Sequence, residues 1–354
     1  MKTYRIGFLY GDGIGPEIMK ATVKILKAIV QQYPDVSVEW VDVPMGVEAI
    51  RLHHHPMPVE TIRALETCHG WIMGPHDSAS YPAEMKVKLN PSGTLRKHFD
   101  LYANIRPARN YPSVQSLKRD VDLVVVRENT EGFYADRNMY HGIGEFMPTP
   151  DIALATGVFT KQAAKRIAHV AFQLAEKRKK YVSIVHKANV LKLSNGLFLD
   201  TCYDVAKQYP NVRVDDYHID AMTAHLLRRA PDFDVIVTTN MFGDILSDLT
   251  AELVGSLGMG GSLNAGDKIA MAQATHGAAP DIAGQGIANP TGIISSAVML
   301  LEWMSKQFHD ATLQNIAQTL DHLLDQVLIS GPLPPDMGGS ASTDAFAQAI
   351  IERV

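Results

Sequence analysis

The sequence predicts an α/β protein built on a largely parallel sheet. Short runs of β-branched and aromatic residues recur along the chain, for example at 4–10 and 121–126. Longer segments with helical spacing of apolar residues lie between many of these runs. Strands that alternate with helices are typical of parallel sheets, because a parallel pair needs a crossover connection. With 354 residues, the chain suits two domains or lobes of about 100–200 residues each.

The first predicted strand, at 4–10, leads through residues 11–17 into a helix with Pro16 near its start. The glycines of this turn have the spacing GxGxG, which differs from the GxGxxG of a Rossmann dinucleotide site.

The loop at 141–150 fits either an arm toward a partner subunit or an ordinary surface loop. Further strands are predicted at 36–43, 70–73, 121–126, 181–185, 212–217 and 234–239, and a helix at 160–177.

The composition limits the classes of partner. A net charge of −5 offers neither the basic face that nucleic acids require nor a polybasic membrane patch. No apolar run is long enough to span a membrane, and the chain enters its first strand without a signal peptide pattern. The two cysteines, Cys68 and Cys202, lack metal-ligand spacing. We therefore expect a cytoplasmic protein without nucleic acid or membrane partners.

Two aspartates, Asp244 and Asp248, follow the apolar strand predicted at 234–239. A helix that begins after a turn at Gly243 places both carboxylates on one face, one turn apart. Their mutual repulsion favours a cation between them, and two hard oxygen ligands suit Mg²⁺ or Mn²⁺. The same spacing is also typical of an acid at a helix N-terminus beside a solvated surface charge.

Several arginines lie among apolar residues or at a predicted strand end. Arg96 and Arg106 belong to the segment at 95–109, and Arg127 ends the strand predicted at 121–126. Guanidinium groups bind carboxylates through paired hydrogen bonds, and ligands of open α/β sheets lie at strand ends. Each arginine taken alone is more often a surface ion-pair partner. Together with a metal site, the three indicate a substrate with several carboxylates.

Tyr134 and Lys187 are the candidates for proton transfer. Tyr134 closes the segment that begins at Arg127, and Lys187 follows the strand predicted at 181–185. A partly buried ammonium beside a cation is able to lose its proton near neutral pH. Without such surroundings, both are ordinary polar residues.

Five segments form a recognisable series. They read GDGIGPE at 11–17, LRKHFDLYANIRPAR at 95–109, VRENTEGFY at 126–134, IDAMTAHLL at 219–227 with NMFGDILSDLTAELVGSLG at 240–258, and HGAAPDIAGQGIANP at 276–290. In this order, and across nearly the whole chain, they resemble the β-decarboxylating dehydrogenase family, which includes isocitrate, homoisocitrate, 3-isopropylmalate and tartrate dehydrogenases.

The resemblance implies a fold of two lobes, formed by residues 1–101 with 255–354 and by residues 102–254, and a homodimer with shared active sites. It also implies three sets of roles: metal binding by Asp244, Asp248 and Asp220 of the partner subunit; binding of substrate carboxylates by Arg96, Arg106 and Arg127; and proton transfer by Tyr134 and Lys187 of the partner subunit. The metal assists both hydride loss from C2 and departure of the β-carboxylate.

The cofactor site implied by the resemblance is not a Rossmann fold. It lies on the loop that contains His276, Gly277, Asp281, Ile282 and Asn289. A carboxylate at Asp281 accepts hydrogen bonds from a ribose 2′-OH and repels a 2′-phosphate, so NAD is expected. Relatives that use NADP have a basic and an aromatic residue at these two positions.

Two departures from the family pattern bear on the site. Gln273 replaces the usual Glu, which removes a charge expected near the nicotinamide ribose. Before Arg96, isopropylmalate enzymes have paired leucines, whereas this chain has Asn90 and Ser92, followed by Gly93. An apolar substituent would lose about 1 kcal/mol per methylene there. Isocitrate enzymes have Ser and Asn in the reverse order, so we expect an isocitrate-like substrate, with homoisocitrate, 3-isopropylmalate, tartrate and D-malate as alternatives.

Two readings from other classes remain. A non-catalytic regulatory subunit would be expected to lack some of the metal-binding or proton-transfer residues that this chain retains. If the chain were a metal-dependent hydrolase or lyase, the loop around Asp281 would have no function.

Overall fold

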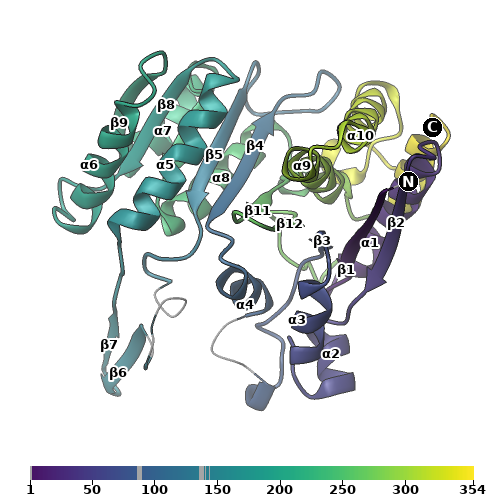
Figure 1. The fold of residues 1–354 in the computed structure, drawn as a ribbon, viewed down its shortest axis with the longest axis horizontal. Helices are drawn as coiled ribbons and strands as arrows, with labels where there is room; N and C mark the ends of the chain where they lie inside the picture. Colours follow the sequence, from purple (N-terminus) through teal and green to yellow (C-terminus); the bar gives the residue numbers. More distant parts are fainter. Residues whose placement is uncertain (1, 86–89, 135–138, 140, 143) are drawn as a thin grey trace.

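The computed structural model describes residues 2–85, 90–134, 139, 141–142 and 144–354. A ten-stranded sheet forms the framework of the molecule (Figure 1). Its strands are β1 (Lys2–Leu9), β2 (Val36–Asp42), β3 (Gly70–Met73), β4 (Ala103–Arg109), β5 (Asp122–Glu128), β8 (Tyr181–His186), β9 (Arg213–His218), β10 (Val235–Thr238), β11 (Leu263–Ala265) and β12 (Ala270–Gln273).

The strand order is β2-β1-β3-β12-β11-β4-β5-β10-β8-β9. Strands from the two ends of the chain therefore lie on one side of the β11–β4 pair, and strands from its middle on the other. All neighbours run parallel except the pairs that involve β4 or β11. The predicted α/β class with a largely parallel sheet is confirmed.

The helices cover both faces of this sheet. They are α1 (Gly15–Val30), α2 (Gly46–His53), α3 (Val59–Glu66), α4 (Pro91–His98), α5 (Lys161–Glu176), α6 (Ser194–Ala206), α7 (Ile219–Arg229), α8 (Asn240–Val254), α9 (Thr291–Phe308), α10 (Ala311–Ser330) and α11 (Thr343–Ile351), with short 3₁₀ helices at Ala83–Met85, Ala230–Asp232, Leu257–Met259 and Pro335–Met337. Among the helices of the described residues, none combines the length and the apolar character needed to cross a bilayer.

Strand β5 illustrates how the alternation of side chains builds two cores. Val124 and Val126 belong to a core with α5 and α6, whereas Leu123 and Val125 belong to a core with α7 and α8. Successive side chains of a strand point to opposite faces, so a continuous apolar run indicates burial on both. Helices α1, α9, α10 and α11 form the largest core, on the other half of the sheet.

The antiparallel centre of the sheet was not predicted. Strand β4 has the sequence ANIRPAR, in which polar residues and a proline interrupt the apolar pattern, and β11 is three residues long. The side chains of Asn104 and Arg106 are nevertheless buried. The pattern failed because these polar side chains face a polar site rather than water.

A separate hairpin, β6 (Glu145–Thr149) and β7 (Ile152–Ala155), extends away from the rest of the molecule (Figure 1). Its first strand falls within the loop predicted at 141–150, of which residue 143 lies outside the described residues, and its second strand follows that loop. Four large apolar side chains of the hairpin are exposed: Phe146, Met147, Ile152 and Leu154.

The turn predicted at Gly243 is wrong. Helix α8 begins three residues earlier, at Asn240, and Gly243 lies within it. A Cβ atom at Gly243 would lie 2.6 Å from Cβ and Cγ of Arg127. The glycine allows α8 to approach β5 closely, and this packing explains it better than a turn does.

Candidate active site

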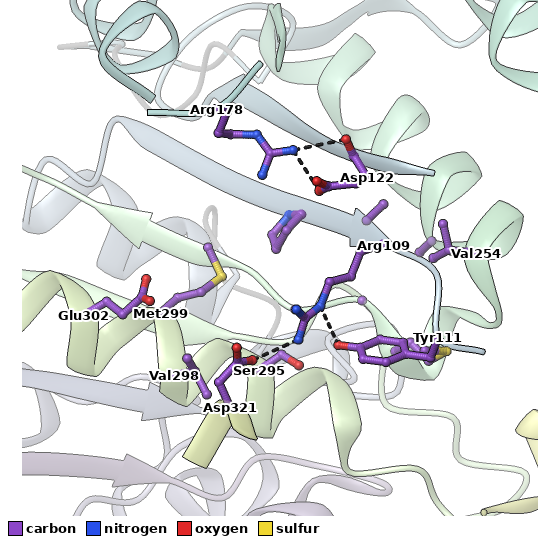
Figure 2. Close-up of a pocket in the computed structure, with 16 residues that line it drawn as sticks. Arg109, Tyr111, Asp122, Arg178, Val254, Ser295, Val298, Met299, Glu302 and Asp321 are labelled. Carbon is purple, nitrogen blue, oxygen red and sulfur yellow. Dashed lines mark hydrogen bonds and ion pairs between the residues drawn. The ribbon is translucent and has the colours of Figure 1, made fainter. Parts of the chain in front are cut away.

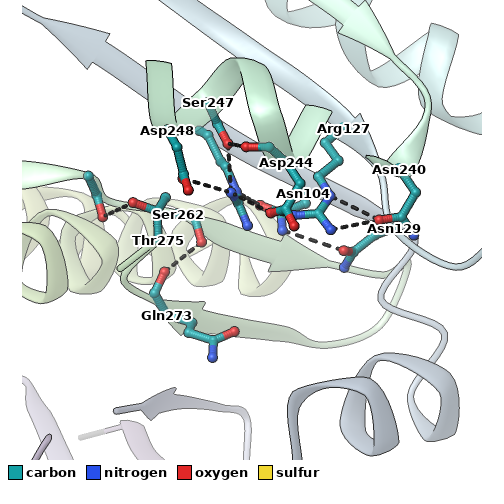
Figure 3. A network of polar contacts seen from close by, with 12 residues as sticks. Asn104, Arg127, Asn129, Asn240, Asp244, Ser247, Asp248, Ser262, Gln273 and Thr275 are labelled. Atoms are coloured by element: carbon teal, nitrogen blue, oxygen red, sulfur yellow. Dashed lines mark hydrogen bonds and ion pairs between the residues drawn. The ribbon is translucent and has the colours of Figure 1, made fainter. Parts of the chain in front are cut away.

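Asp244 lies at the centre of a group of charged side chains where β4, β5 and α8 meet. Arg127 projects from β5, pairs with Asp244, and donates from Nε to Asn240 Oδ1 at 3.0 Å (Figure 3). Helix α8 starts at Asn240, so its first turns present both residues to the end of β5. The structure thus brings together Asp244 and Arg127, which the sequence placed 117 positions apart.

Arg106 approaches the same carboxylate from β4. Its Nη1 lies 3.2 Å from Asp244 Oδ1 and 3.9 Å from Asp248 Oδ1, and it donates to Ser247 Oγ at 2.6 Å. Asp244 and Asp248 therefore share one face of α8, as predicted. The arginine side chains are almost inaccessible, with 5% of Arg106 and 2% of Arg127 exposed.

The electrostatics of this group fit a divalent cation. Burial opposes ionisation of Asp244, but Arg127 and Arg106 outweigh it and hold the pKa of the carboxyl below its usual range. Burial raises the pKa of Asp248, Arg106 opposes that shift, and the negative charge of Asp244 adds to it. A metal ion between the two carboxylates would relieve this repulsion.

A third protein ligand is not found nearby in the part of the chain that the structure describes. Among the described residues, no three His, Cys, Asp or Glu side chains gather at a possible metal site. Asp220 lies at the start of α7 and pairs with Lys187, and the carboxylate of Asp220 is 68% exposed. Neither residue lines the cavity beside Asp244.

That cavity, which we call the site cavity, has a volume of about 320 Å³. Arg96 lines it from the last turn of α4, and its Nη2 donates to Gln273 Oε1 at 3.3 Å. Gln273 Nε2 in turn donates to Ser92 Oγ at 2.8 Å. Other residues around it include Pro75, Asn90, Arg106, Arg127, Tyr134 and Asp244. All three predicted substrate arginines therefore face one space.

Asn90 has a structural role that the sequence reading missed. It is the N-cap of α4, and its Oδ1 accepts a hydrogen bond from Gly93 N at 2.7 Å. The order Asn-Pro at the start of a helix was a signal for this cap. Ser92, by contrast, is buried and accepts a hydrogen bond from Gln273 in the wall of the cavity.

Tyr134 approaches the second carboxylate oxygen of Asp244, whereas Arg106 approaches the first. Its hydroxyl is 3.4 Å from Asp244 Oδ2. The preceding segment is held by Glu131, whose carboxylate accepts hydrogen bonds from Thr160 N and Thr160 Oγ1 at 2.8 and 2.9 Å. Glu131 was not singled out from the sequence, although its place in the segment VRENTEGFY was a signal.

The loop at 276–290 borders the site cavity through His276 and Gly277. The buried Nε2 atom of His276 has no hydrogen-bond partner among the described residues, which fits a ligand beside it. Asp281 is exposed and Ile282 is half-buried, so a carboxylate and an apolar side chain are available at the two positions predicted to read the ribose. Asn289, also predicted to bind the cofactor, has hydrogen bonds within the chain instead. Its Nδ2 donates to Asp336 Oδ2 at 2.9 Å, and its Oδ1 accepts from Thr291 N.

A second cavity, of about 330 Å³, lies where β4 passes α9 and α10 (Figure 2). Arg109 there donates to the Tyr111 hydroxyl at 2.8 Å and to Asp321 at 3.0 Å, and Arg178 pairs with Asp122 at 2.8 Å. The two arginines of this second cavity are therefore neutralised by carboxylates of the same chain. We therefore assign the chemistry to the site cavity.

Known proteins with similar sequences and structures extend this picture. The profile of the isocitrate/isopropylmalate dehydrogenase family matches residues 5–354. An isocitrate/homoisocitrate dehydrogenase of Thermus thermophilus is 42% identical over 99% of this chain and 98% of its own. A 3-isopropylmalate/3-methylmalate dehydrogenase of Methanocaldococcus jannaschii is 39% identical over 99% of each chain. The crystal structure of isocitrate dehydrogenase from Methylococcus capsulatus superposes with a TM-score of 0.88, at 36% identity over 99% of each chain.

The fold and the charged cavity, together with these similarities, define an oxidoreductase that acts on small carboxylate substrates. The chain belongs to the isocitrate/isopropylmalate dehydrogenase family, whose members oxidise and decarboxylate 3-substituted malates. The family fold predicted from the five sequence segments is confirmed. Members of this family generally use NAD or NADP and Mg²⁺ or Mn²⁺.

Proposed function

We propose that this chain is an NAD-dependent and divalent-metal-dependent dehydrogenase that decarboxylates an isocitrate-like 3-substituted malate. The convergence of three buried arginines with Asp244 on one cavity is the observation that supports it most strongly. Buried guanidinium groups need anionic partners, and here Arg106 and Arg127 share Asp244, with Asp248 3.9 Å from Arg106. Substrate carboxylates provide the further anions.

The substituent at C3 selects among the family's substrates. Ser92 and Gln273 present a hydroxyl and an amide to the site cavity in place of apolar side chains. Ser92 and Gln273 bond to each other, but an isopropyl group would offer no acceptor to the second amide proton of Gln273. A carboxylate or another acceptor on the substituent would accept that proton, and this favours an isocitrate-like substrate over 3-isopropylmalate.

The chain's own residues have distinct tasks in this reaction. Arg96, Arg106 and Arg127 hold the substrate carboxylates and orient C2. Lys187 removes the proton of the C2 hydroxyl, and Tyr134 returns a proton to the enol carbon after carbon dioxide has left. Asp244 and Asp248 would hold the metal, and the loop at 276–290 the cofactor. When bound, the metal supplies Lewis-acid stabilisation of the developing negative charge, and NAD accepts the hydride.

We infer a homodimer with shared active sites. Lys187 and Asp220 form an ion pair that does not line the site cavity of their own chain. The α6 region near this pair exposes the apolar side chains of Val190, Leu193 and Leu197. Large exposed apolar groups beside polar functional residues are typical of an interface. In a dimer, Lys187 and Asp220 would complete the site of the partner, and the lobes formed by 1–101 with 255–354 and by 102–254 would close on the substrate.

The test is initial NADH formation with Mg²⁺ or Mn²⁺ on isocitrate, homoisocitrate, 3-isopropylmalate, D-malate and tartrate, compared as kcat/KM. We expect a tricarboxylate to exceed 3-isopropylmalate by at least tenfold. A higher value for 3-isopropylmalate overturns the substrate assignment, and higher activity with NADP than with NAD overturns the role of Asp281. In addition, a mixture of Lys187→Ala and Tyr134→Phe subunits should regain activity, because each mixed dimer then has one intact site.

A further inference from the structure

A run of hydrogen bonds crosses one wall of the site cavity, from Arg96 to the loop that follows β3. Arg96 donates to Gln273, and Gln273 donates to Ser92 Oγ. Ser92 Oγ lies 2.9 Å from His76 Nε2, and Ser78 Oγ lies 2.9 Å from His76 Nδ1. His76 lines the same cavity as the three arginines. The proposed function assigns no role to His76.

The chemistry of Arg96 fixes the orientation of the Gln273 amide, and one tautomer of His76 completes the run. A guanidinium only donates, so the amide of Gln273 must present its oxygen to Arg96 and its NH₂ to Ser92. Ser92 Oγ already accepts from Gln273, and its single proton is therefore available to His76 Nε2. The other ring nitrogen, Nδ1, then carries the imidazole proton and donates to Ser78 Oγ.

The surroundings keep His76 neutral at neutral pH. Burial and the nearby Arg96 lower its pKa to about 4, while Asp12 and Asp77 act in the opposite direction. A neutral ring with Nδ1 protonated is an acceptor at Nε2. A Glu at position 273 would accept the Ser92 proton instead, and His76 would need the other tautomer. Gln273 is therefore compatible with a neutral His76 that is protonated at Nδ1.

We propose that His76 is a specificity-determining residue for the substituent at C3, which it recognises together with Ser92 and Gln273. This inference rests on the proposed function. The wall offers neutral hydrogen-bonding groups and the guanidinium of Arg96, without the negative charge that a Glu at 273 would add. This wall of the site cavity fits a C3 substituent that ends in a carboxylate. Gln273 donates its second amide proton to that group. His76 accepts the Ser92 proton, and Ser92 Oγ accepts from Gln273, so His76 fixes the orientation of the amide through Ser92.

The first test compares substrates with and without a C3 substituent. We expect His76→Leu to lower kcat/KM for the preferred tricarboxylate at least tenfold relative to D-malate, which has no such substituent. Where D-malate is not oxidised, its inhibition constant against the tricarboxylate takes the place of kcat/KM. His76→Gln retains an acceptor toward Ser92 and should restore most of the preference. His98→Leu is the matched control, because His98 is half-exposed at the end of α4 and pairs with Glu66.

The outcomes separate this inference from the proposed function. An equal loss for D-malate and the tricarboxylate in His76→Leu shows a merely structural role and overturns the inference, while the proposed function stands. A wild-type enzyme that oxidises none of these acids overturns both.

A second measurement does not depend on activity. The ¹⁵N NMR shifts of His76 should report protonation at Nδ1 in the wild type and at Nε2 in Gln273→Glu. Protonation of the wild-type ring at Nε2 overturns the proposed arrangement.

Discussion

The carboxylate of Glu17 accepts a hydrogen bond from the backbone N–H of Ala288 at 3.0 Å, across 271 positions of sequence. Its second oxygen accepts from Gly286 N at 3.2 Å. The loop at 276–290 is thus attached to the first turn of α1. A second attachment lies nearby, where Ile14 N donates to Ala278 O at 2.9 Å. The glycine-rich turn at 11–17 therefore positions the proposed cofactor loop and need not contact phosphate itself.

Replacement of Glu17 should weaken cofactor binding. Glu17→Ala removes two hydrogen bonds to the loop, each worth about 1 kcal/mol, so we expect KM for NAD to rise about tenfold or more. KM for the hydroxy acid should change little, because Glu17 does not line the site cavity. Steady-state kinetics with each substrate varied in turn provide the measurement. Glu39→Gln is the control, since Glu39 lies in an exposed ion pair with Arg5; an equal change in both KM values would argue against a role specific to the loop.

Asp244→Asn should abolish turnover and destabilise the protein. Arg106 and Arg127 lose the carboxylate that they share, which we expect to lower the free energy of unfolding by about 1–3 kcal/mol. Activity at saturating Mn²⁺ should fall by more than about 100-fold, because both the metal and the substrate arginines are affected. Urea denaturation and NADH formation measure the two effects.

Asp321→Asn is the matched variant in the second cavity. It removes one of two carboxylates from the half-exposed Arg109, so stability should change by less than about 1 kcal/mol. Activity should be retained. A comparable loss of activity in Asp321→Asn would show that the second cavity takes part in the reaction.

Sequence reasoning succeeded where local spacing decides geometry. Asp244 and Asp248 face one direction because they are four apart on a helix, and Arg127 reaches Asp244 because it lies near the end of β5. It failed for His76, whose partners Ser92 and Gln273 come from distant segments. Position alone does not reveal a hydrogen-bond network, since its members share no periodicity. Lys187 and Asp220 remain predictions for the partner's site, because contacts between chains lie outside what one chain determines.

Glu131 should make stability depend on pH. Burial raises its pKa to about 7, the hydrogen bonds from Thr160 oppose that shift, and Glu128 adds to it. The folded protein thus binds this proton more tightly than the unfolded chain, whose carboxyl has a pKa of 4.5. Stability therefore falls as pH rises from about 4.5 to about 7, and this contribution is constant above that range.

Glu131→Gln should remove this dependence, because the amide does not titrate. The difference in free energy of unfolding between pH 5 and pH 8 should shrink by on the order of 2 kcal/mol. Urea titrations at both pH values, without metal, measure it. Glu352→Gln, at an exposed site near the C-terminus, should leave the dependence unchanged. Parallel stability curves for wild type and Glu131→Gln would contradict the assignment.

Gly243→Ala tests the close packing of α8 on β5. The added Cβ would lie 2.6 Å from side-chain carbons of Arg127, too close for two carbon atoms, so the arginine or the helix must move. We expect a loss of about 1–3 kcal/mol in stability and a fall of about 100-fold in kcat/KM, because Arg127 leaves its position. Gly196→Ala is the matched control, since a Cβ there meets no atom within 4 Å. Gly196→Ala should stabilise the protein by about 0.5–1 kcal/mol, because alanine has the higher helix propensity in α6. An equal gain in stability for both variants would show that Gly243 is not needed for the close packing of α8 on β5.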